Sequence, residues 1–217
     1  MSGRRGFSLA ELVIAMALSS FVMIGIVGIS AQMVRYQVEG MKKGSVTGWS
    51  LVSISRMNKE IEDATVLVYP TNASGSRDTL IGCKNWSRYA NGGAGGRLDT
   101  SGAPAGNVIL FYYCYDTTNR YIRRYANVGV GVSCPAGVPA IPACDGSGGW
   151  TENDVVATGV YRDTSNNFLF RRADEVGGIQ VRYVVGNPTP TTNMPQPQTM
   201  AFDTRLAMNK QYNNTLD

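Results

Sequence analysis

Residues 6–34 read GFSLAELVIAMALSSFVMIGIVGISAQMV, and this stretch decides how the chain is organised. No charged residue occurs in the 23 positions between Glu11 and Arg35. As a helix these positions extend roughly 35 Å, which is enough to cross a bilayer. Arg4 and Arg5 precede the span, so the positive-inside rule places the N-terminus in the cytoplasm. The stretch predicts a membrane-spanning helix with a single acid, Glu11, at its start.

A cleaved secretory signal and a plain signal anchor are the alternatives for this segment. A secretory signal has a shorter apolar region that is followed by a small-x-small site. Here the small residue, Gly6, comes before the apolar run, so cleavage after it would leave the span attached. A plain signal anchor remains open, and it predicts no processing at Gly6.

The motif GFSLAEL at residues 6–12 resembles the class III signal of type IV pilins and pseudopilins. This resemblance covers the N-terminal segment only. It implies that a prepilin peptidase cuts after Gly6 and that the new N-terminal residue, Phe7, is N-methylated. It also implies that Glu11 is the glutamate through which subunits assemble.

The chemistry of Glu11 agrees with that resemblance. A lone carboxylate at the membrane edge costs a few kcal/mol unless it is paired. Cleavage after Gly6 would create an ammonium at Phe7, four positions before Glu11. Glu11 can neutralise this ammonium within one subunit, or reach that of a neighbour in a stack and set the axial register. The alternative is that Glu11 is only an acid at a helix N-terminus.

The sequence predicts four segments: a leader peptide at 1–6, a transmembrane and assembly helix at 7–34, an amphipathic continuation of the helix at 35–66, and an extracytoplasmic β-rich domain at 67–217. The continuation has an apolar face, formed by Ile54, Met57, Ile61 and Ala64. Its opposite face is charged and is formed by Arg56, Lys59, Glu60, Glu62 and Asp63.

The pattern beyond the helix predicts strands at 107–115, 120–128, 154–162, 167–173, 177–185 and 200–209. DTTNRYIRRYA and DTSNNFLFRRA align without gaps, which predicts two hairpins with similar turns, with duplication as the alternative. The fold class is α+β: a long N-terminal helix packed on an antiparallel sheet with Gly- and Pro-rich loops, as in the pilin-like family. The later strands resemble the larger minor pilins of the PilW type and the minor pseudopilins of the GspJ type.

Four cysteines, Cys83, Cys114, Cys134 and Cys144, follow the span, and outside the cytoplasm they are expected to form two disulfides. Three pairings are open. We favour Cys83–Cys114 and Cys134–Cys144, because the second closes a short Pro-rich loop. The cysteines lack metal-ligand spacing and the chain has no histidine, so no metal site is expected.

The absence of histidine also removes the usual general base, so no catalytic residue and no enzyme activity are predicted. No cofactor is expected; the alternative is Ca²⁺ bound by oxygens of Asp145, Ser147, Glu152 and Asp154. One segment is both basic and aromatic and offers a ligand contact, for instance to DNA phosphates and bases. It consists of Arg120, Tyr121, Arg123, Arg124 and Tyr125. The alternative is a hairpin whose arginines face solvent or pair with acids.

These observations predict a non-enzymatic minor pilin that primes or caps a type IV pilus or related filament, in motility, adhesion or DNA uptake. The alternatives are a minor pseudopilin of a type II secretion system and a tip module that binds DNA or surfaces. Expected partners are other minor and major pilins, the prepilin peptidase, the inner-membrane assembly platform and a tip adhesin, with nucleic acid as a further alternative. The expected location is the bacterial inner membrane, with a single pass and a periplasmic C-terminal domain, and then the pilus or cell surface.

Overall fold

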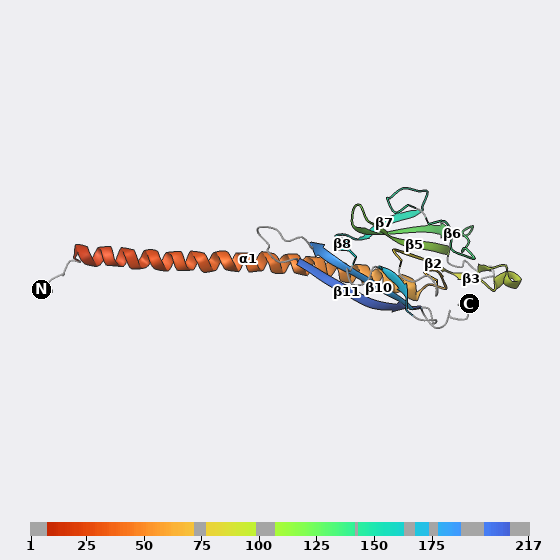
Figure 1. The fold of residues 1–217 in the computed structure, drawn as a ribbon, viewed down its shortest axis with the longest axis horizontal. Helices are drawn as coiled ribbons and strands as arrows, with labels where there is room; N and C mark the ends of the chain where they lie inside the picture. The colour runs from red at the N-terminus through yellow and green to blue at the C-terminus, as the bar shows by residue number, and fades with distance from the viewer. Residues whose placement is uncertain are drawn as a thin grey trace. The chain divides into compact units, whose positions relative to one another are not determined.

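The computed structural model describes residues 8–71, 77–98, 107–141, 143–162, 168–173, 178–187 and 198–208. The chain divides into two compact units, Met1–Ser45 and Val46–Asp217. Helix α1 (Leu9–Glu62) contributes to both units, and every described strand belongs to the second (Figure 1). The predicted α+β fold class is confirmed.

The first unit is the N-terminal part of α1. Its segment Leu9–Met41 has 33 residues, the most apolar 18-residue window within it has a mean hydropathy of 2.6, and the segment is long and apolar enough to cross a membrane. None of the side chains in its most apolar window is buried. This is the property of a helix whose apolar surface meets lipid or other helices rather than its own domain.

In the second unit, α1 buries the apolar face that the sequence predicts. Met57 and Ile61 are fully buried, and so is Ala64 just after the helix. The helix ends at Glu62 rather than near residue 66. The reason is the β-branched run that follows, which forms strand β1 (Val66–Tyr69) and pairs with β2 (Thr79–Lys84). Neither strand was among those predicted from the sequence.

A five-stranded antiparallel sheet has the order β1-β2-β5-β6-β7. Its last three strands are β5 (Val108–Asp116), β6 (Tyr121–Gly129) and β7 (Glu152–Ala157). The hairpin of β5 and β6 is confirmed, and its turn is stabilised by Asp116, whose carboxylate accepts hydrogen bonds from the amides of Thr118 and Asn119.

A second sheet has the order β11-β10-β8, with β9 also paired to β10. These strands are β8 (Val160–Tyr161), β9 (Phe170–Arg172), β10 (Gly178–Asn187) and β11 (Gln198–Ala207). A small hairpin of β3 (Trp86–Ser87) and β4 (Gly96–Arg97) encloses a 3-10 turn at Ala90–Gly93.

The predicted second hairpin is wrong. The expected strand 154–162 is divided between β7 and β8, which lie in different sheets. β8 and β9 each pair with β10 rather than with each other. Gly159, with a φ of 63°, occupies the turn at which the chain leaves the first sheet. The turn expected at 163–166 lies outside the described residues.

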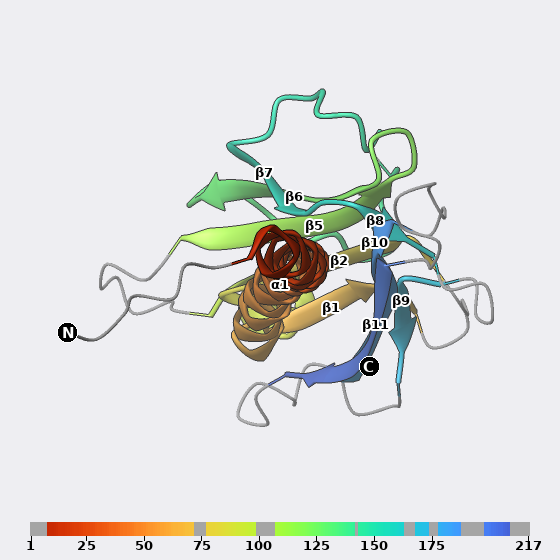
Figure 2. The ribbon, with the colours of Figure 1, turned by 90° about the vertical axis from the view of Figure 1, so that its left-hand side faces the viewer.

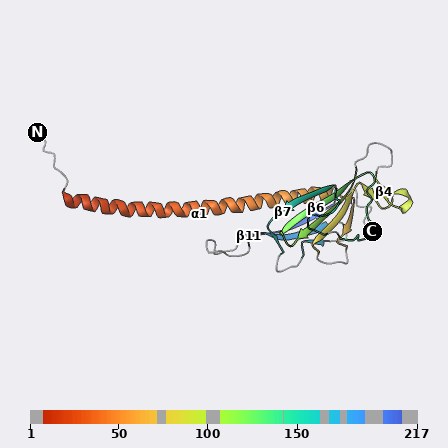
Figure 3. The same cartoon turned by 90° about the horizontal axis from the view of Figure 1, so that it is seen from above.

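The main core lies where both sheets meet the C-terminal part of α1 (Figure 2). It joins Met57 and Ile61 of α1 to Phe111 of the first sheet and to Tyr183 and Leu206 of the second. Figure 3 shows β6 and β7 beside the same part of the helix. The other face of the five-stranded sheet carries a smaller cluster, which includes three of the four cysteines as buried members.

Candidate functional site

Ser8 and Glu11 form a reciprocal cap at the start of α1. The amide of Ser8 donates to Oε2 of Glu11 at 2.9 Å, and the amide of Glu11 donates to Oγ of Ser8 at 3.2 Å. This capping box satisfies two amides that have no partner inside the helix. Both residues are exposed. Gly6 and Phe7 lie outside the described residues, so cleavage and methylation there stay predictions.

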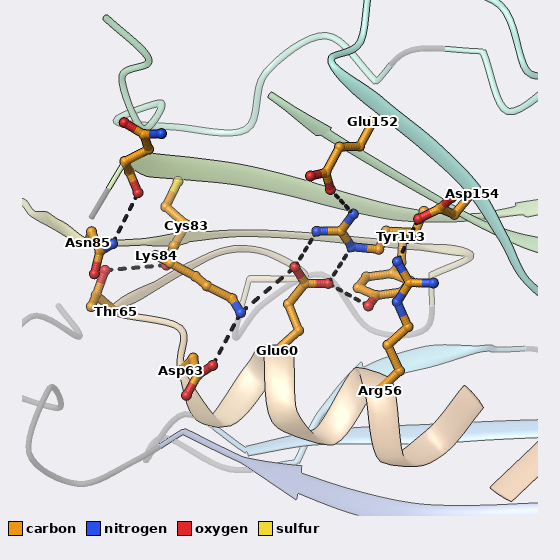
Figure 4. Close-up of polar contacts among 12 residues, drawn as sticks. Arg56, Glu60, Asp63, Thr65, Cys83, Lys84, Asn85, Tyr113, Glu152 and Asp154 are labelled. Carbon is orange, nitrogen blue, oxygen red and sulfur yellow. Dashed lines mark hydrogen bonds and ion pairs between the residues drawn. The ribbon is translucent and has the colours of Figure 1, made fainter. Parts of the chain in front are cut away.

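The C-terminal part of α1 is attached to the first sheet by Glu60 and Arg124 (Figure 4). Nε and Nη2 of Arg124 donate to the two carboxylate oxygens of Glu60 at 2.7 and 2.6 Å. The Tyr113 hydroxyl donates to the same carboxylate at 2.5 Å. The remaining nitrogen of Arg124 donates to Glu152 at 2.5 Å. The side chains of Glu60 and Arg124 are only 6% and 7% exposed, so this is a buried, bidentate ion pair.

The surroundings keep both partners charged. Burial by itself raises the pKa of Glu60, but the hydrogen bonds from Arg124 and Tyr113 and the charges of Arg124 and Lys84 outweigh it and hold the pKa below its usual value. Burial lowers the pKa of Arg124, and its bonds to Glu60 and Glu152 more than reverse this. Burial and the Glu60 carboxylate raise the pKa of Tyr113, so its hydroxyl keeps its proton.

The helical pattern predicts Glu60 on the charged face of α1, opposite the apolar face, but the structure shows Glu60 buried. Glu60 follows Met57 by three residues and precedes Ala64 by four, so helical geometry places it beside the buried face. That spacing was the available signal for its burial. Around the pair lies a charged cleft lined by Arg56, Lys59, Glu60, Asp63, Lys84, Arg124 and Glu152.

Residues 1–27 match the model of the prokaryotic N-terminal methylation motif. The matched segment includes Gly6, Phe7, the Ser8–Glu11 cap and the first part of the apolar span. This match supports a pilin-like family for the chain. Its class III prepilin signal implies processing by a prepilin peptidase and assembly with other pilins. No curated protein and no solved structure matches the chain.

This pilin-like chain is anchored in a membrane by its N-terminal helix, and its C-terminal domain lies outside the lipid. The motif is that of structural filament proteins. The apolar segment and the signal overlap in sequence, because the matched residues 1–27 run well into Leu9–Met41. The signal for processing and the apolar segment that anchors the chain therefore lie in one stretch of the sequence.

Two disulfides tie the segment after β6 to the sheet. They join Cys83 to Cys134 and Cys114 to Cys144, with Cα atoms 6.0 and 5.9 Å apart. All four predicted cysteines are therefore bonded, but the pairing we favoured is wrong. Cys83 lies opposite Leu110 in the β2–β5 ladder, four residues before Cys114. That offset is about 13 Å along the strand, too far for a disulfide.

The predicted basic and aromatic contact residues do not form one surface. Arg124 and Tyr125 are buried, and the Tyr125 hydroxyl accepts a hydrogen bond from the amide of Gly146. Arg123 lies over the Tyr121 ring, 5.5 Å from its centre, and donates to Asp116 at 3.0 Å, as the alternative of arginine–acid pairing predicts.

Arg120 is the exposed member of the set. Its guanidinium lies 4.5 Å from the ring centre of Tyr161 and also binds the Tyr161 hydroxyl. Strand geometry explains the separation, because successive side chains of β6 point to opposite faces of the sheet. A ligand at all five residues is therefore not supported.

The four residues considered for Ca²⁺ do not converge. The Asp145 carboxylate accepts a hydrogen bond from the amide of Ser147 at 2.8 Å. Glu152 binds Arg124, and Asp154 binds Arg56 at 2.5 Å. Across the described residues, no three Asp, Glu, Cys or His side chains gather as a metal site. Calcium binding at these residues stays a prediction.

Proposed function

We propose that this chain is a non-enzymatic minor subunit that primes or caps a type IV pilus or related filament. The observation that carries the proposal is the position of the Glu11 carboxylate, 2.9 Å from the amide of Ser8 at the edge of a charge-free span. Cleavage after Gly6 would place the Phe7 ammonium one residue from that amide. This proximity supports a role for Glu11 in binding the new N-terminus of its own or a neighbouring subunit.

The capping role of Glu11 and this assembly role are compatible. Only Oε2 accepts the Ser8 amide, and among the described residues Oε1 has no hydrogen-bond donor. A carboxylate offers about four acceptor positions, so one oxygen can cap the helix while the other binds an ammonium. In the low dielectric of a helix bundle, an unpaired Phe7 ammonium would cost free energy. The Glu11 carboxylate of one subunit would pair with the Phe7 ammonium of its neighbour and remove this cost.

The remaining features support the same assignment. Two disulfides suit a domain outside the cytoplasm, which agrees with a periplasmic and then filament-exposed location. The buried Glu60–Arg124 pair attaches the domain to the helix that would join the filament core. The minor role rests on the resemblance of the later strands to minor pilins, and a minor pseudopilin of a secretion system is the second candidate on the same ground.

Co-expression with an active prepilin peptidase tests the proposal. The expected product, by intact mass and N-terminal sequencing, begins at methylated Phe7 and co-purifies with other pilins from membranes. Gly6→Leu is the matched control, because a bulky residue should block cutting while leaving the span unchanged. Full-length chain that retains Met1 beside an active peptidase would contradict the proposal.

A further inference from the structure

Strand β11 ends its sheet. It pairs with β10 through ten consecutive residue pairs, from Gly178 with Ala207 to Asn187 with Gln198, without a bulge. Within the described part of the chain no strand pairs with its other side, and Figure 1 shows β11 as the outermost strand of that sheet. A regular edge of this length presents a row of unpaired amides and carbonyls, which is a template for a further strand.

The sequence of this edge is complementary to itself. Residues 201–207 read AFDTRLA, centred on Thr204. If a second copy pairs antiparallel about Thr204, Asp203 lies opposite Arg205 of the other copy, and the reverse pair forms by symmetry. Phe202 then lies opposite Leu206, and the two threonines face each other at the dyad. Opposite charges and apolar partners at such positions stabilise a strand pair.

We propose that β11 is a homotypic interaction surface, which binds β11 of a second copy of this chain about a two-fold axis at Thr204. The resulting contact is isologous, so each copy contributes the same residues. The two three-stranded paths would join into one continuous sheet by strand addition.

The burial pattern fits this pairing. Pairing about Thr204 places even-numbered residues of one copy opposite even-numbered residues of the other. The core-facing side chains of both copies therefore lie on the same side of the joined sheet. Phe202 and Leu206 lie on that face; Leu206 is buried, and Phe202 stacks on Tyr183. The odd residues Ala201, Asp203, Arg205 and Ala207 are all exposed.

Arg205 lacks a carboxylate partner among the described residues, whereas Asp203 accepts a hydrogen bond from Gln180 at 2.7 Å and lies 3.9 Å from Arg182. A second copy would supply Arg205 with an acid that the described residues of its own chain do not provide. This charge complementarity favours a copy of the chain over an unrelated strand as the occupant of the edge.

The two-fold symmetry also restricts which copies of the chain can pair through β11. β11 runs in the same sense as the part of α1 in the second unit, residues 46–62 (Figure 1). A two-fold axis between the strands therefore turns the second helix segment to the opposite direction. Subunits within one filament share a direction, so the pairing joins copies on different filaments. This last step alone rests on the proposed function.

Cysteine cross-linking of the purified full chain in detergent tests the register. Thr204→Cys should give a disulfide-linked dimer, because residues opposite each other at the dyad have Cα atoms about 4.5–5.5 Å apart. Ala201→Cys alone is the matched control: residue 201 would lie six residues, or about 20 Å, from its symmetry mate. An equal mixture of Ala201→Cys and Ala207→Cys chains should give a mixed dimer. Equal yields from Thr204→Cys and Ala201→Cys, or no mixed dimer, would overturn the proposal.

Charge reversal in the Thr204→Cys chain tests the ion pairs. Asp203→Arg or Arg205→Asp alone places like charges opposite each other twice and should lower the dimer yield about tenfold. Mixing the two variants restores opposite charges at both positions, so the yield of mixed dimer should recover. Failure to recover would overturn the proposed register. The assay uses isolated chains, so its result does not depend on whether the chain joins a filament.

Discussion

Arg124 of β6 binds Glu60 of α1 through two hydrogen bonds of 2.7 and 2.6 Å, although 64 residues separate them in the sequence. The pair connects the end of the long helix to β6, the strand next to the edge strand β7 of the first sheet. A buried ion pair of this kind contributes little net stability compared with apolar residues, but it is strongly destabilising to break. We therefore expect the pair to select one helix position on the sheet.

Replacing one partner of the Glu60–Arg124 pair should therefore lower the free energy of unfolding of the domain. We expect Arg124→Met to lower the free energy of unfolding by about 3–5 kcal/mol, because Glu60 is left buried without its main partner. The double variant Glu60→Met with Arg124→Met should cost less than Arg124→Met alone. Denaturant unfolding followed by circular dichroism measures both.

Arg56→Met is the matched control. It breaks a half-exposed pair with Asp154 and should cost about 1 kcal/mol or less. Equal losses for Arg124→Met and Arg56→Met would contradict this role.

Acid should destabilise the domain in a defined range. Burial raises the pKa of Asp116, but hydrogen bonds from Asn119 and Arg123 outweigh it and lower the pKa from 3.8 to about 2. A lowered carboxyl pKa contributes stability that is present above pH 3.8 and is lost as the pH falls toward 2. The lowered pKa of Glu60 acts in the same direction.

Thermal unfolding between pH 6 and pH 2 checks this sign. The melting temperature should fall most steeply below about pH 4, and Asp116→Asn should be less stable at pH 6 and show a shallower fall. A variant that keeps the wild-type slope would exclude Asp116 as a source of the acid sensitivity.

Non-reducing peptide mapping should find Cys83 linked to Cys134 and Cys114 linked to Cys144. The bridges close loops with sequence separations of 51 and 30 residues. In the chain-entropy description each contributes about 4 kcal/mol, so the double serine variants of either bridge should lose similar stability. Peptides that join Cys83 to Cys114 would contradict the register of β2 and β5.

The variant Glu11→Gln distinguishes the helix-capping role of Glu11 from the role of its negative charge. Glutamine can still serve in a capping box, so the helix start should persist while the negative charge is lost. If Glu11 binds the Phe7 ammonium of a neighbour, the loss is about 3–5 kcal/mol, or at least a hundredfold weaker association. Co-purification with partner pilins measures this.

Ser8→Ala is the matched control for that experiment. It removes the side-chain cap at a cost of about 1 kcal/mol and keeps the carboxylate, so association should be largely retained. Normal co-purification of Glu11→Gln would leave Glu11 as a capping residue only.

The sequence by itself determined the features that depend on neighbouring residues. The signal at residues 6–12, the apolar span after Glu11 and the buried face of Met57 and Ile61 each follow from a short pattern. So does the hairpin of β5 and β6, because Asp116 opens a tight turn between two alternating segments. These properties are set by helix period, strand period and turn chemistry, which act over a few residues.

Only the tertiary structure decided the rest. Which cysteines pair depends on the register of β2 against β5, and the burial of Glu60 depends on Arg124 arriving from a distant strand. The assignment of β8 and β9 to a common partner, β10, likewise depends on long-range pairing. The physical reason is that strand register and ion-pair choice are settled by the packing of segments far apart in sequence, about which local patterns carry no information.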